Sequence, residues 1–293
     1  MNEAAGLNAA AIRADARHER AALIGLTVPA FLLLGALLFI PVGWLFWLSL
    51  YDETGFTFAN YARMIEEPSY LSVFTTTLQL SALVTLLAVL LGYPVAYAIA
   101  LMPPRVATLC LSLVLVPFWT ALLVRTYAWL VLLQRRGIIN SLLTSWGVIE
   151  EPLQLVHNFT GTVVGMLHIM IPFFVLPLYA NIRAVDRDLL RAAASLGATP
   201  ATAFRRVFLP LTVPGLAAGT VMVFVLCLGF YVTPQFLGGG RVTTISMKIQ
   251  QNAALYFDWG AASALGVVLF AITMLVFWGF SRIFPIGRLA GSA

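Results

Sequence analysis

Long apolar stretches without charged residues constrain this chain more than any other feature of its sequence. Five of them contain no Asp, Glu, Lys or Arg: Ala21–Leu50, Leu71–Pro104, Pro152–Ile182, Val207–Gly240 and Trp259–Ser281. A sixth stretch, Val106–Gln134, is interrupted only by Arg125. A helix needs about 20 apolar residues to cross the hydrocarbon core of a bilayer. The sequence therefore predicts an all-α integral membrane protein with six transmembrane helices.

The composition excludes the common classes of soluble protein. Of the 293 residues, 61% are hydrophobic and only 10% are charged, whereas a soluble domain carries about 25% charged residues. No soluble fold could bury so much apolar surface. A soluble enzyme, a disulfide-rich secreted scaffold and a disordered chain are therefore excluded.

The basic residues predict how the chain is oriented. If the N-terminus lies inside, most of the 17 Lys and Arg residues fall in cytoplasmic segments, as the positive-inside rule requires. We therefore expect both termini in the cytoplasm. The expected division is a cytoplasmic arm over residues 1–20, a six-span domain over 21–284, and a cytoplasmic tail over 285–293.

The inner loop between the fourth and fifth spans, residues 183–212, carries helix start and stop signals. Asp186 and Asp188 favour a helix N-terminus. Gly197 lies where a helix would end in a left-handed residue. Thr199 can then cap a second helix with Pro200 at its first position. The signals predict a helix–turn–helix outside the membrane.

One face of this loop is apolar and has no local core to bury it. Leu189, Ala193 and Leu196 recur at helical spacing. Two interpretations follow from the residues alone. The loop is either an amphipathic linker that rests on the inner leaflet, or a docking element for a partner protein.

The spacing within the loop resembles a known motif. Ala192-Ala193, Gly197 and Val207-x-Leu209-Pro210 resemble the E-A-A-x-x-x-G-x9-I-x-L-P loop of ABC-importer permeases, although Arg191 stands where that family usually has Glu. The resemblance implies a type I ABC importer permease fold in which this loop contacts an ATPase. The implied coupling residues are Arg191, Ala192, Ala193, Leu196, Gly197, Thr199, Pro200, Arg205, Val207, Leu209 and Pro210.

Other segments are similar to the spermidine/putrescine branch of these permeases. They are Pro117–Thr120, Arg125–Trp129, Gly137–Asn140, Leu176–Tyr179, Tyr231–Pro234 and Leu237–Gly240. The resemblance implies a multi-pass subunit of the bacterial inner membrane that forms half of a translocation pathway for a polyamine. The implied partners are a dimer of cytoplasmic ABC ATPases, a second homologous permease subunit and a periplasmic solute-binding protein.

Arg125 is the only formal charge within a predicted span, and such residues are costly and commonly functional. It is either a pathway residue or a structural arginine that hydrogen-bonds to carbonyls of a broken helix. Trp129, four residues later, could form a cation–π contact with Arg125. We interpret His168, in the fourth span, as a hydrogen-bonding group between helices. The candidate pathway residues are Trp119, Arg125, Thr126, Tyr127, Tyr231 and Thr233.

No catalytic, cofactor or metal motif is present. The sequence lacks a G-x-x-x-x-G-K-[ST] phosphate loop, so ATP hydrolysis is expected from separate subunits. Membrane lipid is expected around the spans, and no nucleic-acid partner is expected.

Two alternatives stay open: an importer for an amino-acid-like or opine-like solute with Arg125 facing its carboxylate, or an ion-coupled secondary transporter. The spans lack the Asp or Glu that such carriers commonly place in the membrane.

Overall fold

The computed structural model describes residues 2–52 and 55–283, with side chains described from residue 24 onward except at residue 52. A short antiparallel hairpin, with Tyr51 opposite Phe56, is the only sheet in this described part. In chain order the elements are α1 (Asn2–Leu50), β1 (Tyr51–Asp52), β2 (Gly55–Phe56), α2 (Ala59–Glu66), α3 (Pro68–Leu101), α4 (Pro104–Leu115), η1 (Val116–Trp119), α5 (Leu122–Leu133), α6 (Ile138–Ser145), α7 (Phe159–Ala184), α8 (Asp188–Ser195), α9 (Pro200–Ala203), η2 (Phe204–Phe208), α10 (Leu209–Leu228), α11 (Val232–Leu237), α12 (Ile245–Gln250), η3 (Gln251–Leu255) and α13 (Trp259–Ile283).

The described helices confirm the all-α membrane fold. Five segments are long and apolar enough to cross a bilayer: Ile24–Leu50, Pro68–Leu101, Phe159–Ala184, Pro200–Leu228 and Trp259–Arg282. A sixth span is obtained if the bent pair Pro104–Trp119 and Leu122–Ser145 is counted as one.

The predicted third span is not one helix. A proline inside an apolar run, here Pro117, predicts a kink in the helix, and the structure shows a complete break at which the chain turns by 96°. Thr120 and Ala121 are extended, with ψ of 142° and 139°. Pro117, three residues before this break, cannot donate a backbone hydrogen bond to continue the helix. Arg125 and Trp129 therefore lie on a second, differently directed helix.

The fifth predicted span, 207–240, also differs from the structure. A continuous helical segment runs from Pro200 to Leu228, and Gly229 caps its C-terminus. Glycine is a poor helix former because its backbone loses much conformational freedom. The short helix α11 then begins at Val232 as a separate element. The apolar run of the sequence therefore covers a long membrane helix and a second, separate short helix.

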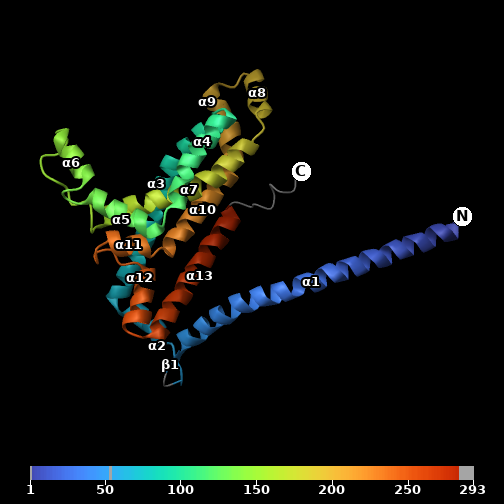
Figure 1. The fold of residues 1–293 in the computed structure, drawn as a ribbon, viewed down its shortest axis with the longest axis horizontal. Helices are drawn as coiled ribbons and strands as arrows, with labels where there is room; N and C mark the ends of the chain where they lie inside the picture. The colour runs from blue at the N-terminus through green and yellow to red at the C-terminus, as the bar shows by residue number, and fades with distance from the viewer. Residues whose placement is uncertain (1, 53–54, 284–293) are drawn as a thin grey trace.

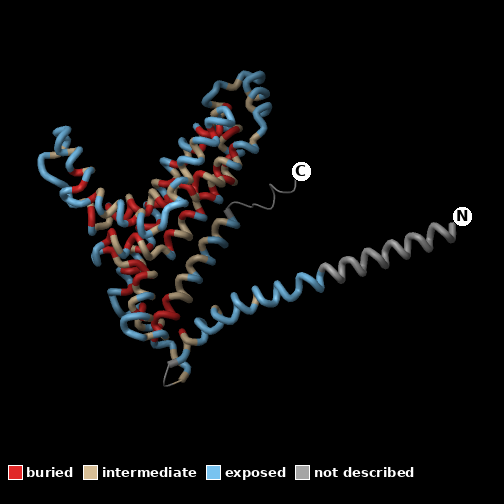
Figure 2. Tube along the Cα trace, viewed as in Figure 1, coloured by how far each residue is buried: buried red, intermediate tan, exposed pale blue. Residues whose placement is uncertain are grey.

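Helices α3, α7 and α10 form the core of the bundle, which Figure 2 shows as its most buried part. Phe174 of α7 is fully buried at the centre. A Cβ at Gly92 of α3 or at Gly219 of α10 would meet the Phe174 ring. Small residues thus allow the three helices to approach closely, as is common where membrane helices cross.

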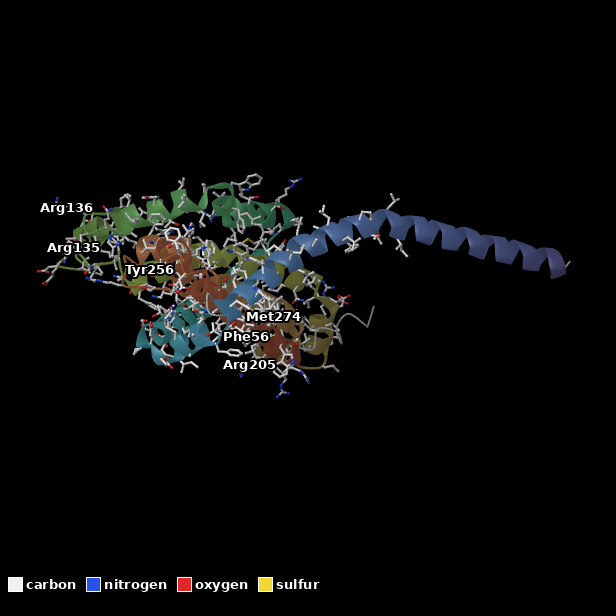
Figure 3. The ribbon with its side chains drawn as sticks, turned by 90° about the horizontal axis from the view of Figure 1, so that it is seen from below. Phe56, Arg135, Arg136, Arg205, Tyr256 and Met274 are labelled. Carbon is white, nitrogen blue, oxygen red and sulfur yellow. The ribbon has the colours of Figure 1, made fainter. Side chains whose placement is uncertain are left out.

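The bundle has two ends, which we call the α8 end and the α2 end (Figure 1). At the α2 end, Arg63 of α2 donates a hydrogen bond to Asp258, just before α13, at 3.0 Å. This hydrogen bond raises the pKa of Arg63, while partial burial opposes the change. Arg135 and Arg136 follow α5 and lie well apart from Arg205 of the α8 end (Figure 3).

Helix α1 diverges from the bundle (Figure 1) and is exposed over most of its described side chains (Figure 2). It meets the bundle near its C-terminal end, where the Phe46 and Phe270 rings lie 6.1 Å apart and Tyr61 donates to the Ser49 hydroxyl at 2.8 Å. The backbone is helical from Asn2 without a break at residues 20 and 21. The predicted tail over 285–293 lies outside the described residues.

Candidate functional site

The turn after α8 has the geometry that its sequence predicts. Gly197 has a φ of +83°, which is the left-handed conformation. The Ala198 N–H donates to Ala193 O at 3.0 Å and the Gly197 N–H to Ala194 O at 2.9 Å, a Schellman arrangement that satisfies two carbonyls at the helix end. A Cβ at Gly197 would meet no atom within 4 Å. The backbone conformation, not crowding, therefore requires glycine here.

The start of the next helix also follows the prediction. Thr199 caps it by accepting a hydrogen bond from the Thr202 N–H at 3.3 Å, and Pro200 occupies the first helical position. One expectation needs correction, because this helix does not end within the loop. It continues through a π-helical turn over Phe204–Phe208 into α10.

Pro210 explains this π-helical turn. Proline has no N–H to donate to the preceding turn, and such turns accommodate a missing bond. Arg205, Val207, Leu209 and Pro210 therefore belong to the first turns of a membrane helix rather than to an independent loop helix. The part of the loop that projects from the bundle is α8 with the Gly197 turn (Figure 1).

The outward side of this projection is apolar. Leu196 is 89% exposed, and Leu189 is also exposed. Arg191 pairs with Asp188 of the same helix at 3.0 Å, with both side chains largely exposed, and such surface pairs contribute little stability. The arginine that replaces the family's usual Glu thus makes a local contact within α8.

In the membrane, the structure brings two of the predicted pathway residues together. Thr126 of α5 and Thr233 of α11 are both fully buried, and their hydroxyl oxygens lie 3.4 Å apart. Thr126 also donates to Leu122 O at 3.0 Å. These two side chains pack the two helices together.

The other predicted pathway residues have different surroundings. Tyr127 is exposed, with its ring 5.2 Å from that of Phe236, and Tyr231 is half-buried at the start of α11. Trp119 is 90% exposed where η1 ends at the bend. Of the predicted pathway residues, Thr126 and Thr233 are therefore the pair that the structure brings into contact.

Arg125 makes no ion pair or side-chain hydrogen bond among the described residues, and its Nε atom is buried without a partner. The predicted cation–π contact with Trp129 is absent, since the described contacts of this kind are Lys248 with Tyr70 and Arg282 with Trp278. The guanidinium group lies on a helix that follows the bend of the third span. Among the described residues, it is the one predicted pathway residue with a buried donor that has no partner.

Trp129 instead contacts His168. Its indole Nε1 donates to His168 Nδ1 at 3.0 Å, with the rings 5.6 Å apart and edge to face. This contact joins α5 to α7, and it confirms the interpretation of His168 as a hydrogen-bonding group between helices. The pairing was missed because the two residues are 39 positions apart and no local pattern links them.

Asn140 is a further residue that sequence reasoning missed. Its side chain bonds to the backbone of Leu153 in both directions, at 2.9 Å each, and donates to Gln134 O at 3.0 Å. These contacts close the segment that contains α6. The amide of a buried asparagine can donate and accept hydrogen bonds at the same time, but the sequence alone does not identify its partners.

Among the side chains that the structure describes, no three from His, Cys, Asp or Glu come together as a possible metal site.

Relatives with similar sequences are permeases of bacterial uptake systems. The chain is 35% identical to the spermidine/putrescine transport system permease protein PotB of Escherichia coli over 231 residues, which cover 78% of this chain and 84% of that protein. The corresponding protein of Haemophilus influenzae is 34% identical over 76% of this chain and 78% of its own length. The inner membrane ABC transporter permease protein YdcU of Escherichia coli is 31% identical over 68% of this chain and 67% of its own length.

Solved structures share the fold. A chain of a bacterial ABC transporter that imports the acidic polysaccharide alginate superposes with a TM-score of 0.74 at 17% identity, covering 93% of this chain and 99% of that one. The same kind of transporter in complex with its alginate pentasaccharide-bound periplasmic protein gives a TM-score of 0.76 at 16% identity, covering 91% and 94%. These similarities concern the fold alone.

The family model described as "binding-protein-dependent transport system inner membrane component" matches residues 12–285. This match covers the long apolar helices and the loop with α8. It decides against the ion-coupled secondary transporter. The chain therefore belongs to the family of binding-protein-dependent transport system inner membrane components, as a membrane permease subunit of an ABC importer and not an enzyme.

Proposed function

We propose that this subunit forms half of the translocation pathway for a polyamine of the spermidine/putrescine class. The observation that carries the substrate class is the 35% identity to a spermidine/putrescine permease over most of both chains. The related segments include α5 and α11, which the structure brings together through Thr126 and Thr233. The membrane part of the pathway would then be built around these two helices.

The proposed site for the ATPase is α8 and the Gly197 turn, with the coupling residues named from the sequence. Leu196 and Leu189 present an apolar surface that nothing in the described chain covers, and such surfaces commonly mark interaction sites. The Schellman turn fixes the direction of α8 relative to the helix that starts at Pro200. A push on α8 would therefore be transmitted directly to the membrane helix that continues to Leu228.

The proposed site for a second, homologous permease subunit includes α1. Leu32, Leu33 and Leu37 are each more than 60% exposed, along with most neighbouring side chains of this helix. Because α1 diverges from the bundle, a long face of this helix is available for packing against another subunit (Figure 2).

The proposed site for a periplasmic binding protein is the α2 end. In this proposed orientation both termini and α8 would lie in the cytoplasm.

Reconstitution tests this function directly. The chain, its cognate second permease, ATPase and binding protein would be placed in liposomes containing ATP, and uptake of radiolabelled spermidine and putrescine measured. We expect uptake only when all components and ATP are present, and none with this chain alone. Uptake of labelled amino acids in place of polyamines by the complete assembly would contradict the polyamine proposal while leaving the permease role intact.

Arg125 favours a second candidate substrate, an amino-acid-like or opine-like solute. Its guanidinium has no hydrogen-bonding partner among the described residues, and planar guanidinium groups bind carboxylates through paired hydrogen bonds. For such a solute, Arg125→Ala should raise the apparent KM of uptake about tenfold or more, with Arg125→Lys restoring part of the loss. Polyamine uptake that is unaffected or improved by Arg125→Ala would reject this candidate.

A further inference from the structure

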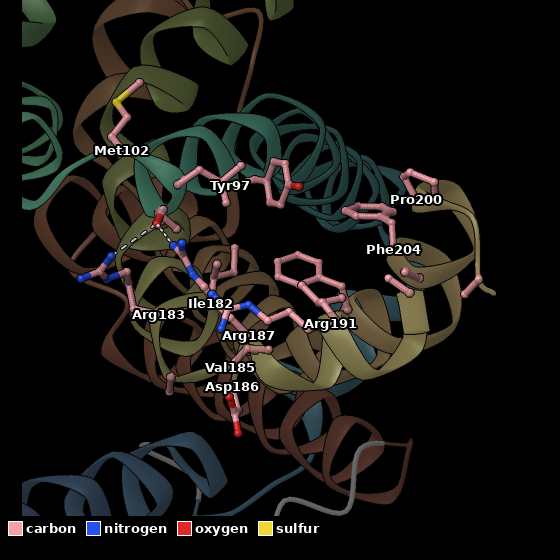
Figure 4. Close-up of a pocket in the computed structure, with 18 of the residues that line it drawn as sticks. Tyr97, Met102, Ile182, Arg183, Val185, Asp186, Arg187, Arg191, Pro200 and Phe204 are labelled. Carbon is pink, nitrogen blue, oxygen red and sulfur yellow. Dashed lines mark hydrogen bonds between the residues drawn. The ribbon is translucent and has the colours of Figure 1, made fainter. Parts of the chain in front are cut away.

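A groove of about 1210 Å³ lies at the α8 end, between the C-terminal ends of α3 and α7 and the inward side of α8 and α9 (Figure 4). Its walls combine two chemistries. One part is aromatic and aliphatic, and the other carries three arginines, Arg183, Arg187 and Arg191. Two of the coupling residues named above, Arg191 and Pro200, also line this groove.

The apolar wall is built from three aromatic rings. The Tyr97 ring lies 5.7 Å from that of Phe204 and 5.3 Å from that of Phe208, and the last two are 5.5 Å apart. Leu101, the last residue of α3, also lines the groove and is 53% exposed. Helices α3 and α7 are apolar enough to span a bilayer and both end here, so in the orientation proposed above this wall faces the cytoplasmic surface of the membrane.

The basic part lies against the end of α3. Arg187 Nη2 donates to Ala100 O at 3.3 Å and Arg183 Nη1 donates to the same atom at 3.5 Å. Each guanidinium carries five N–H donors, so this shared carbonyl uses only a small part of them. The Asp186 carboxylate also lines the groove, but it accepts a hydrogen bond from the Asp188 N–H at 2.9 Å and points away from the guanidinium groups (Figure 4). Arg191 is paired with Asp188, so the positive charge of the groove comes mainly from Arg183 and Arg187.

The groove and the apolar part of the proposed ATPase surface, Leu189 and Leu196, use different sides of α8. Leu190, Arg191 and Ala194 line the groove. Leu189 and Leu196 do not, and they are exposed on the other side. An ATPase bound to the outward side would leave the groove available to another molecule.

We infer that this groove binds an acidic phospholipid of the inner leaflet. Its phosphate would be held by the donors of Arg183, Arg187 and Arg191, since guanidinium groups bind phosphate strongly. An acyl chain would lie along the Tyr97, Phe204 and Phe208 rings. The apolar wall and its proposed position at the cytoplasmic surface of the membrane favour a lipid over a soluble anion, and basic pockets between membrane helices on this side bind such headgroups. The lipid links α8 to the ends of α3 and α7.

Native mass spectrometry of the purified full chain, titrated with dioleoylphosphatidylglycerol or dioleoylphosphatidylcholine, tests the inference. We expect one phosphatidylglycerol molecule to be retained preferentially. In the Arg183→Gln/Arg187→Gln variant its affinity should fall about 30-fold. The matched control is Arg105→Gln, an exposed arginine at the same end that does not line the groove, and it should retain the lipid. Arg183→Lys/Arg187→Lys should restore most of the affinity.

A second variant guards against misfolding, because Arg183 and Arg187 also bond to the end of α3. Leu101→Gln changes the apolar wall without touching a guanidinium group, and it should weaken phosphatidylglycerol retention severalfold. Equal retention of both lipids, or no difference between the groove and control variants, would overturn the inference. Displacement of the lipid by 10 mM inorganic phosphate would also overturn it, because the groove would then be a general anion site. Displacement by the cognate ATPase would overturn it as well, because the groove would then be part of the ATPase interface. None of these readouts requires transport, so the outcome is independent of the substrate.

Discussion

The Gly197 turn and the contact between α5, α7 and α11 represent two opposite ways in which this chain builds a site. The turn is made by residues within one short segment, and its hydrogen bonds join positions three and five apart. The buried contacts join residues far apart in sequence: Trp129 to His168, and Thr126 to Thr233. Local backbone chemistry determines the first, whereas helix packing determines the second. Mutations should therefore affect function at the turn and stability at the buried contacts.

The largest effect is expected for Gly197→Val. A β-branched residue at positive φ costs about 1–2 kcal/mol or more, and the strain would change the direction of α8. ATP-dependent uptake should fall about tenfold or more, because the ATPase binding surface is displaced, while the amount of inserted protein stays unchanged. Co-purification with the cognate ATPase and uptake in liposomes would measure this.

Gly266→Val is the matched control for that prediction. Gly266 lies within α13 and also has open space around an added Cβ, but its φ is not positive. It should support normal uptake. Equal loss in both variants would show that the added side chain, rather than the left-handed backbone, is responsible.

At the buried contacts, Trp129→Phe should be the most destabilising conservative change. It removes the indole N–H and leaves Nδ1 of the half-buried His168 without its donor, which costs about 1–2 kcal/mol. Thermal unfolding in detergent should show a lowered Tm. Trp119→Phe, at a 90% exposed site, serves as control. A Tm unchanged by Trp129→Phe would mean that this hydrogen bond adds nothing to the packing of α5 on α7.

Thr126→Val should have a smaller effect on stability. The residue keeps its shape but loses its hydroxyl contacts to Thr233 and to Leu122 O, and hydrogen bonds of this kind contribute about 0.5–1.5 kcal/mol. The double variant Thr126→Val/Thr233→Val should be no less stable than Thr126→Val alone, because both partners are then apolar. If the losses of unfolding free energy in the two single variants simply add in the double variant, the two hydroxyls do not interact.

The smallest effect is expected for Arg191→Ala. Its pair with Asp188 is exposed on both sides, and such pairs contribute about 0–1 kcal/mol. Helix α8 should keep its structure and the ATPase should still bind. Should Arg191→Ala abolish ATPase binding while the Tm is kept, the arginine would be a direct partner contact rather than a local one.

The sequence specified the local features because they depend on nearest neighbours along the chain. Of the six membrane helices that apolar run length predicted, the first, second and sixth match the structure to within about three residues. The third is bent, the fourth begins later, at Phe159, and the fifth runs from Pro200 to Leu228. Gly197, Thr199 and Pro200 predicted the turn, since positive φ, a hydroxyl cap and a fixed φ are properties of single residues. The sequence also identified Arg125 as unusual, because it is a single charge within an otherwise uncharged apolar run.

The tertiary structure decided everything that depends on which surfaces meet. The 96° bend sets the direction of α5, and in this direction Trp129 meets His168 of α7. The groove beneath α8 exists because α3 and α7 end at the same level, which places three arginines beside three aromatic rings. Helical periodicity fixes which side chains share a face of one helix, but not which face of another helix it meets, because in lipid many apolar surfaces pack equally well and only the details of close contact select one arrangement.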